Sequence, residues 1–431
     1  MALEMTSAVT RPVPRIEGWL VDAAFLGLLL LAFVGVQPFA IRNPATDLEM
    51  GPYTATGGGD WVRQLFYILV FLSIGATAYF RKGLAFLKAI PPALIALLLW
   101  CALSALWATV PEVTIRRAGL AIVAAVSTFL CVDTIGAGRA FRIWWYVLAG
   151  VLIVNWLSIA LVHQAVHLPG EQDGGLVGDW RGLYFHKNIA GAVCAISALV
   201  FGFSALKSKH WIDIALCLAA LGFTVMTKSK TSLGLLVIAF TAGLVYRAAW
   251  KRDLDRMIVG VGALLIAFLL IAFLVVDANA IARLLEDPTE FTGRAAIWQA
   301  ELAFIFDHPL LGSGFGTFAD TGSLSPLHNY VAGTWVEQVA HGHSGYLQLL
   351  VTIGGIGFLL TVIACIAMPA WQFWNRRGGD LNRTAMLFAI FVFIVLHNFL
   401  ESDFLEGDAP AWVAFLLMLA FLRAPETERA Q

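Results

Sequence analysis

Long apolar stretches alternate with short polar ones along nearly the whole chain. A helix needs about 20 mainly apolar residues to cross a bilayer, and charged residues or Gly and Pro separate twelve stretches of about this length. They lie at 19–36, 61–80, 90–108, 115–132, 142–163, 186–206, 211–227, 232–249, 256–277, 343–370, 383–400 and 409–423. The pattern predicts an all-α polytopic membrane protein with about twelve transmembrane helices.

Composition agrees with this prediction and narrows the function. The 431 residues are 59% hydrophobic and 13% charged, whereas average soluble domains are about half apolar and a quarter charged. A formal net charge of −1 gives no basic field for nucleic acid. The five cysteines all lie in apolar stretches without paired spacing, so we expect neither disulfides nor a metal cluster.

Basic residues predict how the chain is oriented. Most of the 28 lysines and arginines fall at the termini and in alternate connections, which the positive-inside rule makes cytoplasmic. The first stretch lacks a small-residue cleavage pattern, so we interpret it as a retained anchor. The predicted organisation is a cytoplasmic tail at 1–18, nine spans within 19–277, a periplasmic loop at 278–342, three spans within 343–423 and a cytoplasmic tail at 424–431.

The predicted outer loop has about 65 residues, well beyond the usual length of a structureless connection. Helical spacing from Arg294 to Phe306 predicts a short surface helix, which Asp307, Pro309 and three glycines end. Free backbone N–H groups at its start, beside Arg294, would form an anion site. Snorkelling of Arg294 to the membrane interface explains the same pattern equally well.

Two other outer segments place cations beside apolar spans. GDWRGLYFHKNIAG contains Arg181 and Lys187, and MTKSKTSLG contains Lys228 and Lys230. A Lys or Arg costs about 2.5–3.5 kcal/mol at the centre of a membrane helix and less near the interface, and the orientation rule also disfavours these positions. We expect an anion to offset both costs, and a phosphate or pyrophosphate head group suits this depth.

Two histidines, His341 and His343, stand in HGHSGYL at the mouth of the span that begins at 343. Metal is not indicated, because no third and fourth ligand follow at a recognisable spacing. A neutral imidazole, with an ordinary pKa of about 6.5, can instead accept a hydroxyl proton at neutral pH. Cations for a phosphate leaving group and a base for a hydroxyl are the parts of a transferase.

Three residues near this region keep open roles. We expect His341 to support His343 or to bind an acceptor. Glu401 and Asp403, in HNFLESDF, either bind sugar hydroxyls or orient a basic residue, or they are solvated acids that mark a helix end.

These motifs together resemble a known family. GRAAIWQAELAFIFDHPLLGSGFGTF, followed by HGHSGYLQLLVTIGGIG, is similar to the C-terminal region shared by O-antigen ligases and Wzy-type polysaccharide polymerases. RGLYFHKN and KSKTSLG look most like the ExoQ-like exopolysaccharide polymerases. The resemblance covers roughly residues 180–360 and implies a GT-C-like glycosyltransferase of the bacterial inner membrane that needs neither metal nor cofactor.

Site roles follow from this resemblance, position by position. The family's catalytic histidine falls on His343, and its pyrophosphate-binding arginine falls on Arg294 in the Gly-Arg-x-x-x-Trp pattern. Lys230 stands where Ser-Arg-Thr is common, which keeps the charge and loses the bidentate fork. Arg181, Lys187, Lys228, His341 and Glu401 complete the predicted binding residues.

The implied substrates are a polyprenyl-pyrophosphate-linked saccharide and an acceptor glycan, with a chain-length regulator and export proteins as expected partners. The predicted activity joins repeat units into exopolysaccharide or O-antigen at the periplasmic face. Ligation of a finished glycan to lipid or protein is the alternative. A lipid-linked sugar transporter is disfavoured, because the mid-span positions are almost free of charge.

Replacing His343 by alanine is expected to abolish polymer formation and to leave membrane insertion intact, because only the base is removed. Polymer length on gels and protein level in membranes measure the two effects. Wild-type amounts of long-chain polymer in this variant would exclude His343 from the catalytic role.

Overall fold

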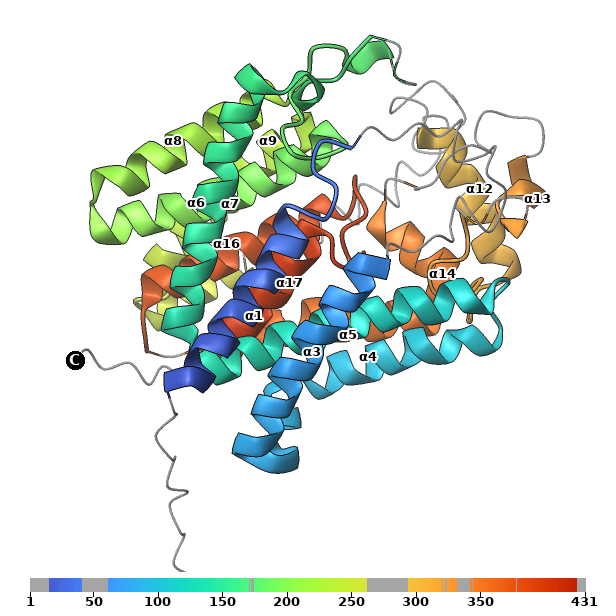
Figure 1. Cartoon of the computed structure of the whole chain (residues 1–431), viewed down its shortest axis with the longest axis horizontal. Helices are drawn as coiled ribbons and strands as arrows, with labels where there is room; N and C mark the ends of the chain where they lie inside the picture. Colours follow the sequence, from blue (N-terminus) through green and yellow to red (C-terminus); the bar gives the residue numbers. More distant parts are fainter. Residues whose placement is uncertain are drawn as a thin grey trace, which may run out of the picture.

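The computed structural model describes residues 15–40, 61–169, 171, 174–261, 294–319, 321, 324–331, 342, 344–376 and 378–424. Within these ranges the protein is helical, apart from one isolated bridge between Val166 and Trp180. The predicted all-α class is therefore confirmed for the described part of the chain (Figure 1).

Apolar helices make up most of the protein. They are α1 (Arg15–Phe33), α3 (Trp61–Lys82), α4 (Pro92–Leu103), α5 (Pro111–Ile135), α6 (Ala137–Leu161), α7 (Lys187–Ser208), α8 (Trp211–Met226), α9 (Lys230–Ala249), α14 (Gly345–Thr361), α15 (Met368–Asn375), α16 (Leu381–His397) and α17 (Pro410–Arg423). Among the described residues of the loop region, two helices precede α14, namely α12 (Arg294–Asp307) and α13 (His328–Val331).

Several of the described helices could cross a membrane. Among the described residues, six helices are long and apolar enough to cross a membrane, and five further apolar helices are shorter. They coincide, within a few residues, with the predicted spans other than 256–277, most of which lies outside the described residues. The chain is a multi-pass membrane protein, and its predicted sidedness stays a prediction.

The connections between helices gather at two ends of the bundle. At one, which we call the Arg139 end, Arg139 pairs with Asp22 and Lys82 lies 2.7 Å from Asp133. The opposite end, the Arg181 end, carries the loops at 162–186, 227–229 and 398–409. There the Tyr184 hydroxyl donates to the Phe33 carbonyl (2.9 Å). Segments predicted to share the outer side therefore meet at one end.

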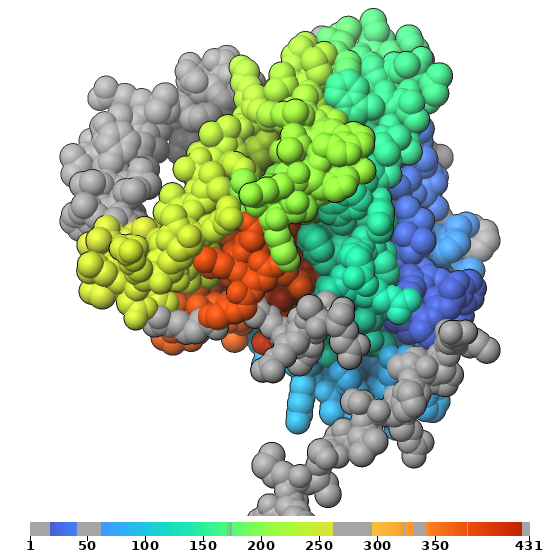
Figure 2. All heavy atoms as spheres, turned by 90° about the vertical axis from the view of Figure 1, so that its left-hand side faces the viewer, coloured from blue at the N-terminus to red at the C-terminus, as the bar shows by residue number. Residues whose placement is uncertain are grey.

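The centre of the bundle is α17, which packs against α5, α7 and α16 (Figure 1). Every residue from Ala411 to Leu422 is buried, as expected for a helix that is apolar on all sides. By contrast, Figure 2 shows the face that α8 and α9 contribute, on which Trp211 (71%), Leu218 (62%) and Val237 (61%) are exposed. Such an apolar outer face suits contact with lipid.

The span that begins at Gly345 is broken at Gly354, whose φ of 67° is non-helical. The loop after α12 enters this break: Ser313 N donates to Val351 O (2.9 Å), Gly314 N to Thr352 O (2.9 Å) and Gly355 N to Pro309 O (2.8 Å). Irregular backbone at membrane depth requires such internal partners. Within GSGFG, Gly312 fits the loop against α14, because an added Cβ there would lie 2.8 Å from both Gly354 N and Thr352 O.

Close packing also joins α9 to α16 at Gly243. An added Cβ there would lie 2.5 Å from Phe203 Cζ, 2.9 Å from Ala385 O and 2.9 Å from Ala389 Cβ. Small residues allow membrane helices to approach in this way.

Gly243→Ala is expected to lower the free energy of unfolding by about 1–3 kcal/mol, the usual cost of overpacking a filled site. Gly234→Ala is the matched control on the same helix, because nothing lies within 4 Å of its added Cβ. Apparent unfolding temperatures in detergent measure both variants. Equal losses in the two would contradict the packing account.

Candidate active site

The loop at 162–186 folds back on itself at the Arg181 end. His167 N donates to Asp179 O (3.0 Å), and Arg181 N and Gly182 N both donate to Ala165 O (2.9 Å). The side-chain oxygen of buried Asn155 on α6 accepts Leu183 N (2.9 Å). Since buried backbone groups need partners, these bonds fix where Arg181 and the start of α7 lie.

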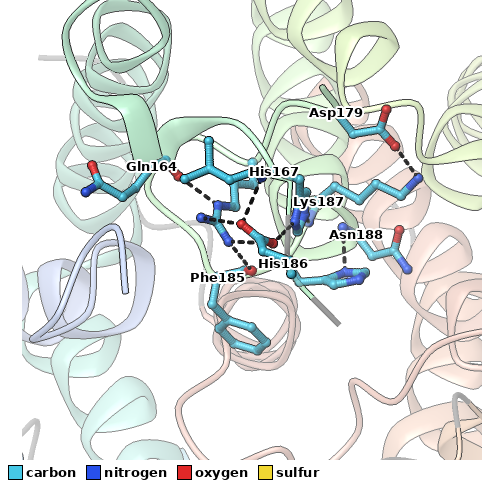
Figure 3. A network of polar contacts seen from close by, with 10 residues as sticks. Gln164, His167, Asp179, Phe185, His186, Lys187 and Asn188 are labelled. Carbon is cyan, nitrogen blue, oxygen red and sulfur yellow. Dashed lines mark hydrogen bonds and ion pairs between the residues drawn. The ribbon is translucent and has the colours of Figure 1, made fainter. Parts of the chain in front are cut away.

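Arg181 is 1% exposed, and its guanidinium contacts the loop residues Gln164 and Phe185, which are labelled in Figure 3. Nε donates to Gln164 O (2.7 Å), Nη1 donates to Phe185 O (3.2 Å), and Nη2 lies 3.2 Å from Glu171 Oε1. Burial opposes ionisation of Glu171, yet hydrogen bonds from Leu168 N and His167 and the charge of Arg181 lower its pKa. The geometry makes Arg181 an anchor of the loop.

Lys187 and Lys228 share one carboxylate, that of Asp179. Their Nζ atoms lie 2.6 and 2.7 Å from its two oxygens. Burial opposes ionisation of Asp179, but the hydrogen bonds and charges of the two lysines outweigh it and lower the pKa. Lys228 has a φ of 51°, uncommon for a residue with a side chain. The pair ties the α8–α9 turn to the start of α7.

Three of the predicted cations find their counter-charge within the chain. Arg181, Lys187 and Lys228 were expected to need an external anion, whereas Glu171 and Asp179 supply the opposite charge from within the chain. Their presence at a membrane edge is therefore no evidence for phosphate, and their role in substrate binding stays a prediction. Lys230 differs: it is exposed and forms no ion pair with any residue that the structure describes.

The same network reaches Glu401. Lys187 N donates to His167 Nε2 (3.2 Å), and the Asn188 side chain donates to Glu401 Oε1 (2.7 Å). The carbonyls of Asn398 and Glu401 both accept the N–H of Gly345 (2.8 and 2.9 Å). The turn after α16 therefore connects the start of α7 to the start of α14.

The helix α12 contacts Gly342, three residues before the start of α14. Its observed bounds agree with the predicted helix, and Ile297, Glu301 and Phe304 are all buried. Trp298 Nε1 donates to Gly342 O (2.9 Å). The Glu301 carboxyl occupies the space that a Cβ at Gly342 would need, and burial raises its pKa to about 8.

The predicted base His343, its neighbour His341 and the side chain of Arg294 lie outside the described residues. The structure does describe what flanks His343. Gly342 packs on α12, and Gly345 is bonded to the 398–401 turn. Four predicted residues, Arg181, Lys187, Lys228 and Glu401, belong to the one network that this turn joins.

One buried pair was not found from the sequence. His397 Nδ1 lies 2.7 Å from Asp403 Oδ2, and His397 Nε2 lies 3.4 Å from Ser232 Oγ. Ser232 in turn accepts from Ser229 (3.0 Å). A separation of six residues across a turn matches no regular element, so no sequence signal marks the pair. It fastens the end of α16 beside Lys230.

Residues 215–362 match the family described as O-antigen ligase. The match runs from within α8, through α9, α12 and α14, to the π-helical turn at Val362–Ala367. It includes Lys228, Lys230, Arg294, His341 and His343. No curated protein matches the chain.

Asp179→Asn is expected to lower the free energy of unfolding by about 1–3 kcal/mol at neutral pH, because it leaves Lys187 without its carboxylate. Since the folded-state pKa of Asp179 is lowered, this contribution is fully present above about pH 4, the ordinary aspartate value, and is lost as pH falls further. Unfolding of both proteins at several pH values tests this. Asp133→Asn, which breaks the more exposed pair with Lys82, should cost less, and an equal loss would contradict the prediction.

Proposed function

Starting from its O-antigen ligase domain, we propose that this membrane glycosyltransferase joins polyprenyl-pyrophosphate-linked oligosaccharide repeat units into exopolysaccharide or O-antigen. One observation carries the proposal. The family match contains His343, Arg294 and Lys230, and the residues that flank His343 pack on α12 and on the turn bonded to α7. The proposed location is the bacterial inner membrane, as the family resemblance implies, and the distribution of basic residues favours its periplasmic face.

In the proposed reaction His343 accepts the proton of an acceptor sugar hydroxyl. The hydroxyl oxygen forms a bond to the anomeric carbon of the donor, and the bond from that carbon to the pyrophosphate oxygen breaks. Arg294 and Lys230 stabilise the charge on the departing pyrophosphate. A single displacement inverts the anomeric centre.

Lys230 is well suited to meet an anionic head group. It is the first residue of α9, where unpaired backbone N–H groups and the helix dipole favour negative charge. Its neighbours Ser229 and Ser232 are buried and bonded to each other, while Lys230 itself is exposed.

The other cations contribute less directly. The Lys228 side chain is 65% exposed, so its ammonium group can contact a head group while Asp179 still holds Lys187. Arg181, whose guanidinium is enclosed by its own loop, positions the start of α7.

The proposed binding site for the acceptor glycan is a pocket of about 650 Å³ at the C-terminal end of α12. Aromatic rings, imidazoles and an amide contribute to its wall, the mixed lining that suits binding of a polyhydroxylated ligand. They come from Trp107, Phe304, His308, His328, Asn329 and Tyr330.

Ligation of a finished glycan is the second candidate, which the family description favours. Both reactions need the same donor chemistry and differ only in the acceptor. The deciding experiment supplies purified protein in proteoliposomes with lipid-linked repeat units on the accessible leaflet. A polymerase yields a ladder of lengths from repeat units alone, whereas a ligase leaves them unchanged until a separate acceptor is added.

Lys230→Ala is expected to lower kcat/KM for the lipid-linked donor about 100-fold, the effect typical of losing one donor to a developing anion. The unfolding temperature should stay near that of the wild type, because no described carboxylate pairs with Lys230. Lys230→Arg keeps the charge and should retain most activity. Unchanged kcat/KM in the alanine variant would remove Lys230 from the site.

A further inference from the structure

Glu301 is a buried carboxyl group that the proposed reaction does not use. It is 1% exposed, and its Oε2 atom has no hydrogen-bond partner among the described residues. An ionised carboxylate without a partner is costly to bury. Burial accordingly raises its pKa to about 8, so that Glu301 is mainly a neutral acid at neutral pH.

The Glu301 carboxyl group lies against Gly342. One turn earlier on α12, Trp298 donates to the carbonyl of Gly342 (2.9 Å). The Glu301 carboxyl fills the space beside the Gly342 Cα atom, where any side chain would overlap Oε1. In HGHSGYL this glycine stands between His341 and His343, and the contact explains why that position has no side chain.

We infer that Glu301 is a positioning residue for Gly342, the residue between His341 and the predicted base His343 in the sequence, and that it works in its protonated form. The inference rests on the proposed function, in which His343 is the base. A neutral acid fills the space beside Gly342 and adds no negative charge near a departing pyrophosphate. An ionised carboxylate there would repel the negatively charged leaving group of the proposed reaction.

The ionisation of Glu301 should be distinguishable from that of the titratable groups around it. Burial is the only cause of the raised Glu301 pKa, so no described neighbour is coupled to it. The titratable and charged groups on the elements packed against it are Arg294 and Asp307 on α12, His308 directly after α12, His328 and Tyr330 on α13, and Tyr346 on α14. The alkaline limb of the rate profile then belongs to Glu301.

The test compares pH–rate profiles of glycosyl transfer in proteoliposomes for the wild type, Glu301→Gln and Glu301→Ala. Wild-type activity should fall about tenfold per pH unit above about pH 8. Glu301→Gln, a neutral group of the same shape, should stay within about threefold of wild type at pH 7 and lose the alkaline fall. Glu301→Ala should lose more than tenfold at pH 7, because the contact with Gly342 is gone.

Glu112→Gln is the matched control, since it makes the same chemical change at an exposed position at the start of α5; it should keep the wild-type profile. Two results would overturn the inference. One is an unchanged alkaline limb in Glu301→Gln. The other is a loss of at least 100-fold at pH 7 in that variant at a wild-type unfolding temperature, which would show that the carboxylate form is needed.

An infrared titration separates this inference from the proposed function. The carbonyl band of a protonated carboxyl group should be present at pH 7, disappear with a midpoint near pH 8, and be absent from Glu301→Gln. If the wild type shows this band and no glycosyl transfer, the proposed function fails and the neutral state of Glu301 stands. If the band is absent at pH 7, the inference fails whatever the activity.

Discussion

A charge near the apolar interior of a membrane protein needs a counter-charge, and this constraint organises the Arg181 end. The structure meets it within the chain: Glu171 holds Arg181, and Asp179 holds both Lys187 and Lys228. Because these partners come from different segments, each ion pair also joins them. The loop at 162–186, the start of α7 and the α8–α9 turn are thereby fixed to one another.

The same end holds the neighbours of the predicted base from two directions. Through Trp298, α12 holds Gly342, and the turn at 398–401 holds Gly345 while Glu401 accepts from Asn188. A catalytic group must be held within a fraction of an ångström of its productive geometry. Backbone contacts on both sides of a short segment are one way to achieve this, and both depend on a glycine that lets another group approach closely.

Pairing within the chain also divides the basic residues by role. A buried arginine whose Nε and Nη1 donate to carbonyls and whose charge is paired with a carboxylate is poorly placed to bind a substrate as well, so Arg181 is best understood as part of the framework. An exposed lysine at a helix start, such as Lys230, keeps its donors for a ligand. The sequence presents both simply as cations beside apolar spans, and only the surroundings separate them.

The sequence by itself determined the helices and the membrane class, because the thickness of a bilayer imposes a length on each apolar stretch. It also determined α12, because the helical spacing from Arg294 to Phe306 is visible in the sequence. The tertiary structure alone decided which groups meet. Glu171 pairs with Arg181 across an irregular loop, Asp179 reaches Lys228 from a distant segment, and His397 finds Asp403 across a turn. No period in the sequence encodes such contacts, since they depend on how helices pack and not on how each one forms.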